Sequence, residues 1–298
     1  MNAPLALEQL RGTVGLWTAT LDGVNVHDSA ELARDVAALG FRALWIPEAW
    51  GREAFTNAAQ LLAASDRLVV ATGIANIWAR DAVAASNAAK TLASASRDRF
   101  VLGLGVSHQP LVTRMRGHDY ARPLAAMRDY LLAMNAAPMF APEHEVRVPR
   151  VLAALGPKML ELARDLSDGA LTYLVDVAHT RGARELLADK FLAVEQAVVL
   201  GETREEYFSR AHEHLNIYTG LDNYRQSWRR QGFSDEDFVR GGSPRLCEAM
   251  VLHGDVDVIK ARVREHVDAG ADHVCLQVLG ATSNAPPRVA WQQLAGLV

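Results

Sequence analysis

The sequence predicts an α/β fold, a closed (β/α)8 barrel with TIM-barrel topology, and three features support this prediction. Short apolar runs recur about eight times with helical patterns between most of them, near residues 13, 42, 68, 100, 150, 170, 194 and 273. The runs lack apolar/polar alternation, which is typical of parallel strands that are covered on both faces. A helix, a glycine and a strand follow one another at Gly40, Gly169 and Gly270, where a left-handed glycine would close each helix. About eight strands favour a closed barrel over an open sheet.

Composition limits the size and class of the protein. The 298 residues are 50% hydrophobic and 22% charged, which suffices for one large domain or two smaller ones. Because no linker or long repeat interrupts the chain, we expect one domain over residues 1–298. The formal net charge of -4 gives no reason to expect nucleic acid or an anionic membrane as partner. The two cysteines, Cys247 and Cys275, are too few for a disulfide framework.

The N-terminal half sets the order of elements. The chain begins without a signal-like segment and contains no apolar run of membrane-spanning length, so we expect a cytoplasmic protein. The first helix is expected to begin near Ser29, with Ser29 as its cap. Because a crossover helix joins the third and fourth strands, these strands should be parallel neighbours. The expected strands are 13–18, 41–47, 68–75 and 100–106, and the later helices include 53–65 and 82–96.

Small-molecule sites in parallel α/β folds lie beyond the carboxyl ends of the strands, here residues 73–76 and 107–109. The segment GLGVSH, residues 103–108, follows a strand as a dinucleotide fingerprint does. His108, however, occupies the position of the third glycine in that fingerprint. We expect instead that these glycines let a flat ligand approach the strand.

A candidate anion site follows the fifth strand. That strand is expected to end at Gly156, and Pro157 occupies the first helical position, followed by Lys158 and Met159. The free N–H groups and the positive end of the helix dipole would then face the barrel mouth. The alternative is a plain turn in which proline only starts the helix.

Several side chains are candidates for chemistry at the mouth. Glu48 ends the second strand and is a candidate proton donor, proton acceptor or hydrogen-bond anchor, or simply a capping carboxylate. His108 is the best-placed imidazole for proton transfer, with an exposed loop histidine as the alternative. Tryptophans near strand ends would line a pocket for a planar ring, or pack in the core; they are Trp17, Trp45, Trp50 and Trp78.

More chain than one crossover needs lies between the seventh and eighth strands. We expect a helical insertion at roughly residues 201–250 that covers the barrel mouth or is buried against another subunit. It contains His212, Glu213 and His214, but two histidines that are two residues apart on a helix point to different faces, so we expect no metal site. Motifs for nucleophilic or metal-dependent hydrolysis are missing from the sequence, whereas hydride transfer needs few such residues because a cofactor carries the reactive atoms.

Five stretches in this order resemble the bacterial luciferase-like family, and within it the actinobacterial branch that uses the deazaflavin coenzyme F420. The resemblance implies a (β/α)8 barrel with an insertion after the seventh strand, a deazaflavin ring in the barrel mouth and a homodimer. The stretches are LWIPEAWGREAFT (44–56), LVVATGIANIWARD (68–81), DRFVLGLGVSHQP (98–110), LAALGPKMLELARDLSDGALTYLV (152–175) and GDVDVIKARVREHVDAGADHVCLQVLG (254–280).

The resemblance also implies roles for individual residues. Gly73-Ile74 matches a bulge with a non-proline cis peptide that supports the ring, and Glu48 matches the acidic member of an acid-histidine pair. The histidine of that pair is replaced by Ala49, so Glu48 or His108 would have to handle the proton. The loops that edge the ring match Ala75, Asn76, Ser107 and His108, and the phosphate-binding turn matches Gly156, Pro157, Lys158 and Met159.

The sequence therefore predicts a coenzyme F420-dependent oxidoreductase that transfers a hydride between the deazaflavin C5 and a small organic substrate. Trp17, Trp50 and Trp78 would shape the substrate pocket. Two alternatives stay open at this point. One is a luciferase-like monooxygenase that uses FMN, and the other is a barrel that binds flavin or deazaflavin without turnover.

Overall fold

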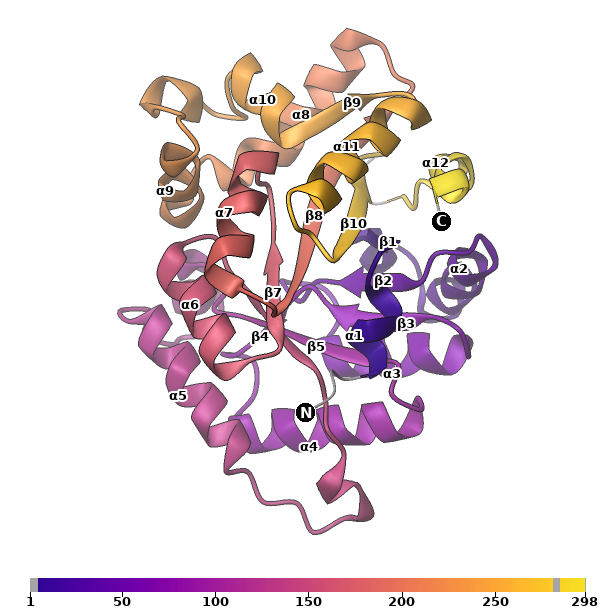
Figure 1. Ribbon diagram of the computed structural model, residues 1–298, viewed down its shortest axis with the longest axis vertical. Helices are drawn as coiled ribbons and strands as arrows, with labels where there is room; N and C mark the ends of the chain where they lie inside the picture. Colours follow the sequence, from indigo (N-terminus) through magenta and orange to yellow (C-terminus); the bar gives the residue numbers. More distant parts are fainter. Residues whose placement is uncertain (1–4, 281–284, 298) are drawn as a thin grey trace.

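The computed structural model describes residues 5–280 and 285–297, and within them eight parallel strands close a barrel (Figure 1). The order around the barrel is β1-β2-β3-β5-β6-β7-β8-β10, and β10 pairs with both β8 and β1. Because every strand lies at one of the predicted positions, the predicted fold class is confirmed. The strands are β1 (Thr13–Trp17), β2 (Ala43–Ile46), β3 (Val69–Thr72), β5 (Phe100–Gly105), β6 (Arg150–Ala153), β7 (Gly169–Thr172), β8 (Phe191–Leu200) and β10 (His273–Val278).

The connecting helices surround the barrel (Figure 1). The helix α1 (Leu5–Leu10) precedes β1 and packs Leu7 and Leu10 against residues of the barrel interior, so it closes the amino end of the barrel. The outer helices are α2 (Val26–Ala38), α3 (Ala54–Ala64), α4 (Ala82–Ala95), α5 (Pro123–Asn135), α6 (Pro157–Leu166), α7 (Val177–Leu187), α11 (Val256–Asp268) and α12 (Arg288–Leu294). Short turns are η1 (Thr20–Gly23), the π-turn η2 (Leu111–Met115), η3 (Pro142–Glu145), η4 (Asp235–Phe238) and η5 (Ala295–Leu297).

The strands are apolar on both faces because each face meets a different part of the core. On β2, Trp45 points into the barrel with the interior cluster, whereas Leu44 and Ile46 pack against the outer helices. Burying both faces removes the reason for an alternating pattern. The barrel is therefore a filled core whose accessible end is the mouth at the carboxyl ends of the strands.

The insertion after β8, which is the seventh barrel strand, lies against that mouth. It contains α8 (Arg204–Tyr218), α9 (Asp222–Arg230) and α10 (Pro244–Met250), and it ends at β9 (Val251–Gly254), which pairs with the far end of β8. Trp228 of α9 is fully buried and donates from its indole N–H to the Leu174 carbonyl beyond β7. Figure 1 shows α8, α9, α10 and β9 together at one end of the molecule.

Two local predictions were wrong. Helix α2 begins at Val26 with Asn25 as its N-cap, while Ser29 lies inside the helix and donates to the Val26 carbonyl. Gly40 and Gly270 have the expected positive φ, but Gly169 lies in β7. A side chain at Gly169 would overlap the Phe191 backbone of the neighbouring strand, which is why glycine is needed there.

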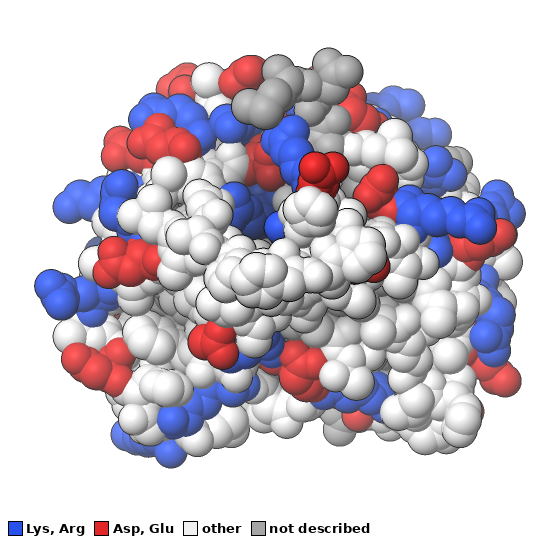
Figure 2. All heavy atoms as spheres, turned by 90° about the horizontal axis from the view of Figure 1, so that it is seen from below, with Lys and Arg blue, Asp and Glu red and all other residues white. Residues whose placement is uncertain are grey.

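The described surface is of mixed charge. Figure 2 shows the face at the α4 side of the molecule, where acidic and basic residues alternate around a broad band of uncharged ones. Within residues 5–280 and 285–297, no helix combines the length and apolarity needed to cross a membrane.

Candidate active site

A bulge after β3 forms one wall of the barrel mouth. The Gly73–Ile74 peptide bond is cis, as the family resemblance implies. The Trp17 indole N–H donates to the Gly73 carbonyl at 2.8 Å, and a Cβ at Gly73 would lie 2.8 Å from the same indole nitrogen. The two-residue strand β4 (Ala75–Asn76) then pairs with Gly105 of β5. The bulge is thus held between the ends of three strands.

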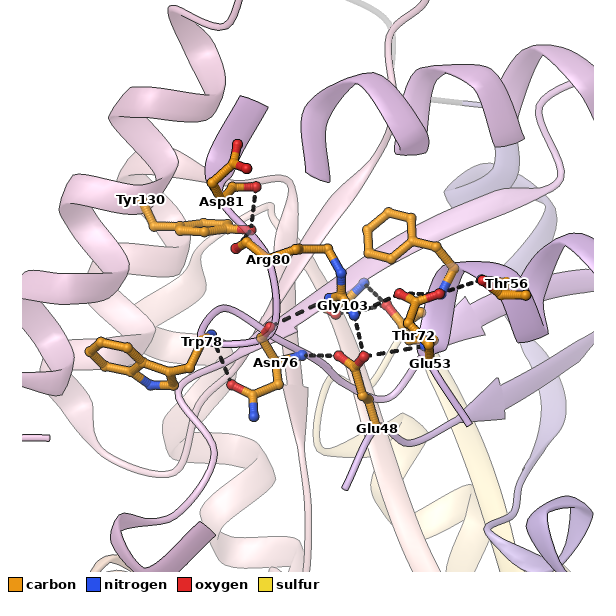
Figure 3. A network of polar contacts seen from close by, with 12 residues as sticks. Glu48, Glu53, Thr56, Thr72, Asn76, Trp78, Arg80, Asp81, Gly103 and Tyr130 are labelled. Atoms are coloured by element: carbon orange, nitrogen blue, oxygen red, sulfur yellow. Dashed lines mark hydrogen bonds and ion pairs between the residues drawn. The ribbon is translucent and has the colours of Figure 1, made fainter. Parts of the chain in front are cut away.

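The glycines of β5 serve the protein core, and the expectation that they also admit a flat ligand stays a prediction. A Cβ at Gly103 would overlap the Thr72 carbonyl of β3, and a Cβ at Gly105 would overlap the Ile74 side chain of the bulge. The Thr72 hydroxyl also donates to the Gly103 carbonyl at 2.7 Å (Figure 3). These glycines allow β3 and its bulge to approach β5 closely.

Glu48 is the centre of a polar network that ties the loops after β2 and β3 together (Figure 3). It is 7% exposed, one carboxylate oxygen accepts from the Asn76 N–H at 2.8 Å, and the other accepts from the Ala54 N–H at 3.3 Å. That second oxygen also forms an ion pair with Arg80, which pairs with Glu53 at 2.7 Å. Of the roles expected for Glu48, this geometry fits the hydrogen-bond anchor, and the proton-transfer role stays a prediction.

His108 follows β5 and faces the insertion. Its ring centroid is 5.8 Å from that of Tyr224 in α9, and its buried Nδ1 atom has no hydrogen-bond partner. Burial lowers the pKa of His108 to about 4, so the imidazole is neutral at pH 7. Ser107 and Leu174, which follow β5 and β7, both have a positive φ, a backbone conformation that is uncommon for residues other than glycine and that clusters at functional sites.

The three predicted pocket tryptophans occupy different environments. Trp17 is 7% exposed and its ring centroid lies 5.3 Å from that of Tyr173, beside the bulge. Trp78 is half-buried and donates to the Val106 carbonyl at 3.0 Å, so it braces the loops after β4 and β5. Trp50 is 65% exposed on the loop after β2. Of the three, Trp17 borders the interior of the mouth.

The turn into α6 has the features of an anion site. The strand β6 ends at Ala153, three residues before the predicted end. Gly156 is the N-cap of α6 and provides no side-chain cap, whereas Asp81 and Asp176 cap α4 and α7. Pro157 has no N–H and the Met159 N–H donates to the Gly156 carbonyl, so the Lys158 N–H is the amide of the first turn that is left to a ligand or water.

Two positive side chains flank this helix terminus. Lys158 is exposed in its first turn, and Arg230 of α9 donates to the Leu155 carbonyl at 3.0 Å. The Met159 N–H donates to the Gly156 carbonyl at 3.1 Å within the same turn. The insertion thus contributes a positive charge, Arg230, that sequence reasoning missed.

Sequence reasoning also missed a group of polar side chains that come from α8 and from the ends of β7 and β10. The Tyr173 hydroxyl donates to Gln277 Oε1 at 2.7 Å and lies 3.0 Å from the Tyr218 hydroxyl. His214 Nε2 is 3.5 Å from the same Tyr173 oxygen. Tyr173 follows β7 directly, so the rule that selected His108 would have found it. His214 turns toward this group while His212 is exposed, in line with the expectation that they lie on different faces.

Other parts of the described chain are less suited to a site. Two surface hollows, one of about 360 Å³, lie beside the last turn of α2, at the amino ends of the strands. Conserved chemistry in barrels of this type is found at the other end. Within the described residues, no three His, Cys, Asp or Glu side chains are grouped so that they could hold a metal ion.

Comparisons with known proteins show the family and the fold of the chain. The family model for luciferase-like monooxygenases matches residues 12–273. A relative from Mycobacterium tuberculosis with the provisional name coenzyme F420-dependent oxidoreductase is 26% identical over 307 residues, which cover 82% of this chain and 88% of the relative.

Solved structures share the fold over almost the whole chain. An F420-dependent secondary alcohol dehydrogenase in complex with an F420-acetone adduct has a TM-score of 0.73 and 14% identity, with 97% of this chain and 98% of that chain covered. The oxygenating component of 3,6-diketocamphane monooxygenase from Pseudomonas putida, in complex with FMN, has a TM-score of 0.69 and 14% identity, with 95% of each chain covered.

Proposed function

Because the chain belongs to the luciferase-like monooxygenase family, we propose that it is a coenzyme F420-dependent oxidoreductase that transfers a hydride to or from a small organic substrate. The observation that carries this proposal is that two features lie at the same end of the barrel, namely the bulge after β3 and the uncapped N-terminus of α6. A flat ring with a phosphate-bearing tail needs both features. The name of the relative from Mycobacterium tuberculosis supports the deazaflavin as the cofactor.

The residues present fit such a cofactor at its two ends. The phosphate would be held at the Gly156–Met159 turn by the N–H groups of Gly156 and Lys158, with the Lys158 and Arg230 side chains close enough to offset its charge. The ring would be supported by the Gly73–Ile74 bulge, which Trp17 fixes from β1. Ala75, Asn76, Ser107 and His108 would edge it, as the resemblance implies. When bound, the deazaflavin supplies or accepts the hydride at C5.

Glu48 and His108 would act differently in this enzyme. Glu48 keeps the loops after β2 and β3 in one arrangement through Arg80 and Asn76, which preserves the shape of the mouth. Burial lowers the pKa of His108 to about 4, so its imidazole is neutral at pH 7 and can accept a hydrogen bond from a ligand, while its role as a base stays a prediction. Ala49 leaves the position beside Glu48 without an ionisable group.

A second candidate function is an FMN-dependent monooxygenase. The FMN-containing Pseudomonas putida enzyme covers 95% of the chain, against 97% for the F420-dependent one, and both cofactors offer a flat ring and a phosphate. The α6 terminus would serve either cofactor. A barrel that binds the cofactor without turnover is the third reading, which Ala49 makes worth testing.

Cofactor titration separates these functions. Binding of each cofactor to the purified protein can be measured by fluorescence quenching. We expect coenzyme F420 to bind at least tenfold more tightly than FMN, and tighter binding of FMN would overturn the proposal. Lys158→Glu should weaken F420 binding, while Lys260→Glu, at an exposed lysine of α11, provides the charge-matched control. Single-turnover oxidation of reduced F420 with enones, imines and ketones then tests for catalysis, and its failure with every compound would favour the binding-only reading.

The resemblance also supports a proposal about assembly. We propose a homodimer, and sedimentation equilibrium should give twice the mass of one chain. A monomer at micromolar concentration would contradict this assignment without affecting the proposed chemistry.

A further inference from the structure

The polar side of the mouth, formed by the ends of β7, β8 and β10 together with α8, has the hydrogen-bonding groups of a substrate site. Tyr173 and Tyr218 are half-buried, and their hydroxyl oxygens are 3.0 Å apart. His214 Nε2 and Gln277 Oε1 lie 3.5 Å and 2.7 Å from the Tyr173 oxygen. Three polar groups, two from α8 and one from β10, thus lie within 3.5 Å of one phenol oxygen.

This group borders the wall at which the cofactor ring is proposed to lie. The Tyr173 ring packs on Trp17 with centroids 5.3 Å apart, and the Trp17 indole donates to the Gly73 carbonyl of the bulge. One continuous set of contacts therefore runs from the bulge to the Tyr173 hydroxyl. A substrate beside the ring would meet that hydroxyl.

Glu195 lies beneath these side chains and is an unusual residue for its position. Among the otherwise apolar or uncharged residues of β8, Glu195 is the one that can carry a charge, and it is only 1% exposed. In the pairing of β8 with β10, it lies opposite Cys275. One carboxyl oxygen accepts from the Leu174 N–H at 3.1 Å, and the other has no hydrogen-bond partner. A buried carboxyl with a free oxygen retains hydrogen-bonding capacity that the folded chain does not use.

At neutral pH this side of the mouth is uncharged. Burial raises the pKa of Glu195 to about 8 and lowers the pKa of His214 to about 4, so both groups are neutral at pH 7. Burial also raises the pKa of Tyr218 to about 12 and that of Tyr173 well above its ordinary value. The ionisable groups that face Glu195 are Tyr173 after β7, Tyr218 of α8, Tyr224 of α9 and Cys275 of β10.

We propose that Tyr173, Tyr218 and His214 bind the oxygen atom of an uncharged carbonyl or alcohol substrate, that Tyr173 exchanges the proton with that oxygen, and that Glu195 is the positioning residue beneath them. The substrate class and the proton role rest on the proposed function. A carboxylate substrate is disfavoured, because its charge would be desolvated among neutral groups and next to a carboxyl that ionises near pH 8.

The proton transfer balances in both directions. During reduction, a bound deazaflavin would supply the hydride to the substrate carbon, the π-electron pair of the carbonyl would move to oxygen, and that oxygen would take the proton that Tyr173 otherwise donates to Gln277. The Tyr173 phenolate then takes the proton of Tyr218, 3.0 Å away. Tyr218 is partly exposed and would regain a proton from water. Oxidation of an alcohol reverses each step.

Ligand binding without cofactor tests the site independently of the proposed function. Saturation-transfer NMR would compare cyclohexanone, cyclohexanol and cyclohexanecarboxylate, which are similar in size and differ in charge. We expect the two neutral probes to bind at least tenfold more tightly than the carboxylate, and Tyr173→Phe to weaken both about tenfold. Tyr207→Phe is the control, since its hydroxyl donates to the Val251 carbonyl inside the insertion. Equal binding of all probes, or of none, would overturn the proposal.

Turnover of the F420-loaded enzyme tests the proton role. Tyr173→Phe should lower kcat for ketone reduction at least a hundredfold while F420 affinity stays within twofold, and retained kcat would overturn the role of Tyr173. In the wild type, kcat should fall above about pH 8, and Glu195→Gln should remove that limb. A limb that persists in Glu195→Gln would remove Glu195 from the proposal. If the wild-type protein does not bind F420 at all, the proposed function is refuted. The NMR comparison would still decide whether the Tyr173 group binds neutral oxygen compounds.

Discussion

Replacing Glu195 with glutamine should stabilise the protein, and the gain should grow with pH. The carboxyl has a pKa of about 8 when folded, against a reference value of 4.5, because it is buried. Between these two values the native state binds a proton that the unfolded state has released, so the free energy of unfolding falls as the pH rises. From pH 5 to pH 8 the loss amounts to about 3 kcal/mol at about 1.4 kcal/mol per pKa unit. Glutamine keeps the shape and cannot ionise.

The assay is thermal or urea unfolding of both proteins at pH 5, 6, 7 and 8. The two proteins should differ little at pH 5, and Glu195→Gln should be more stable by about 3 kcal/mol at pH 8, or about 5 °C in Tm for a chain of this length. Glu206→Gln, at an exposed capping residue of α8, controls for a general effect of removing a carboxylate. A stability difference that is the same at all four pH values would refute the reasoning, because it would mean that Glu195 has the same pKa in both states.

Three further predictions concern the walls of the mouth. Arg80→Gln leaves Glu48 as a buried carboxylate without its cation and should cost about 3–5 kcal/mol in urea unfolding, whereas the double variant with Glu48→Gln should recover part of the loss. Gly105→Ala should destabilise the protein by about 1–3 kcal/mol through overlap with Ile74, and Ile74→Val should relieve it in the double variant. Arg230→Gln should weaken F420 about tenfold in a fluorescence titration with little change in Tm, because the side chain is exposed; unchanged affinity would exclude it from the phosphate site.

The strands were predictable because their physics is local. A parallel strand with helices outside and a filled interior must be apolar on both faces. The runs near residues 42, 68 and 100 meet this requirement within a few consecutive residues, so a local pattern is enough to predict them. The ends of elements depend on longer-range contacts. Gly169 was interpreted as a helix terminator, but the reason for glycine is the Phe191 backbone on the next strand, which no local pattern reveals.

The candidate site was predictable only where a residue follows a strand or starts a helix. That rule selected Glu48, His108 and the turn at Gly156, and it should also have selected Tyr173. It could not predict that Arg80, 32 positions after Glu48, would form an ion pair with the Glu48 carboxylate. It also gave no position for His214, Tyr218 and Arg230, because the way in which the insertion folds back over the mouth depends on its packing against β7 and β8.

Glu48 and Glu195 show how the environment gives one residue type two roles in the same barrel. Glu48 meets two amides and a guanidinium, so both of its oxygens are occupied and its negative charge is compensated in place. Glu195 meets one amide and four groups that are neutral at pH 7, so burial acts on it without compensation and favours the protonated form. With Ala49 in the position after Glu48, this side of the mouth offers no second ionisable group beside that carboxylate. The exchangeable protons lie across the mouth, at Tyr173, Tyr218 and Glu195, and that is where a substrate oxygen should be sought.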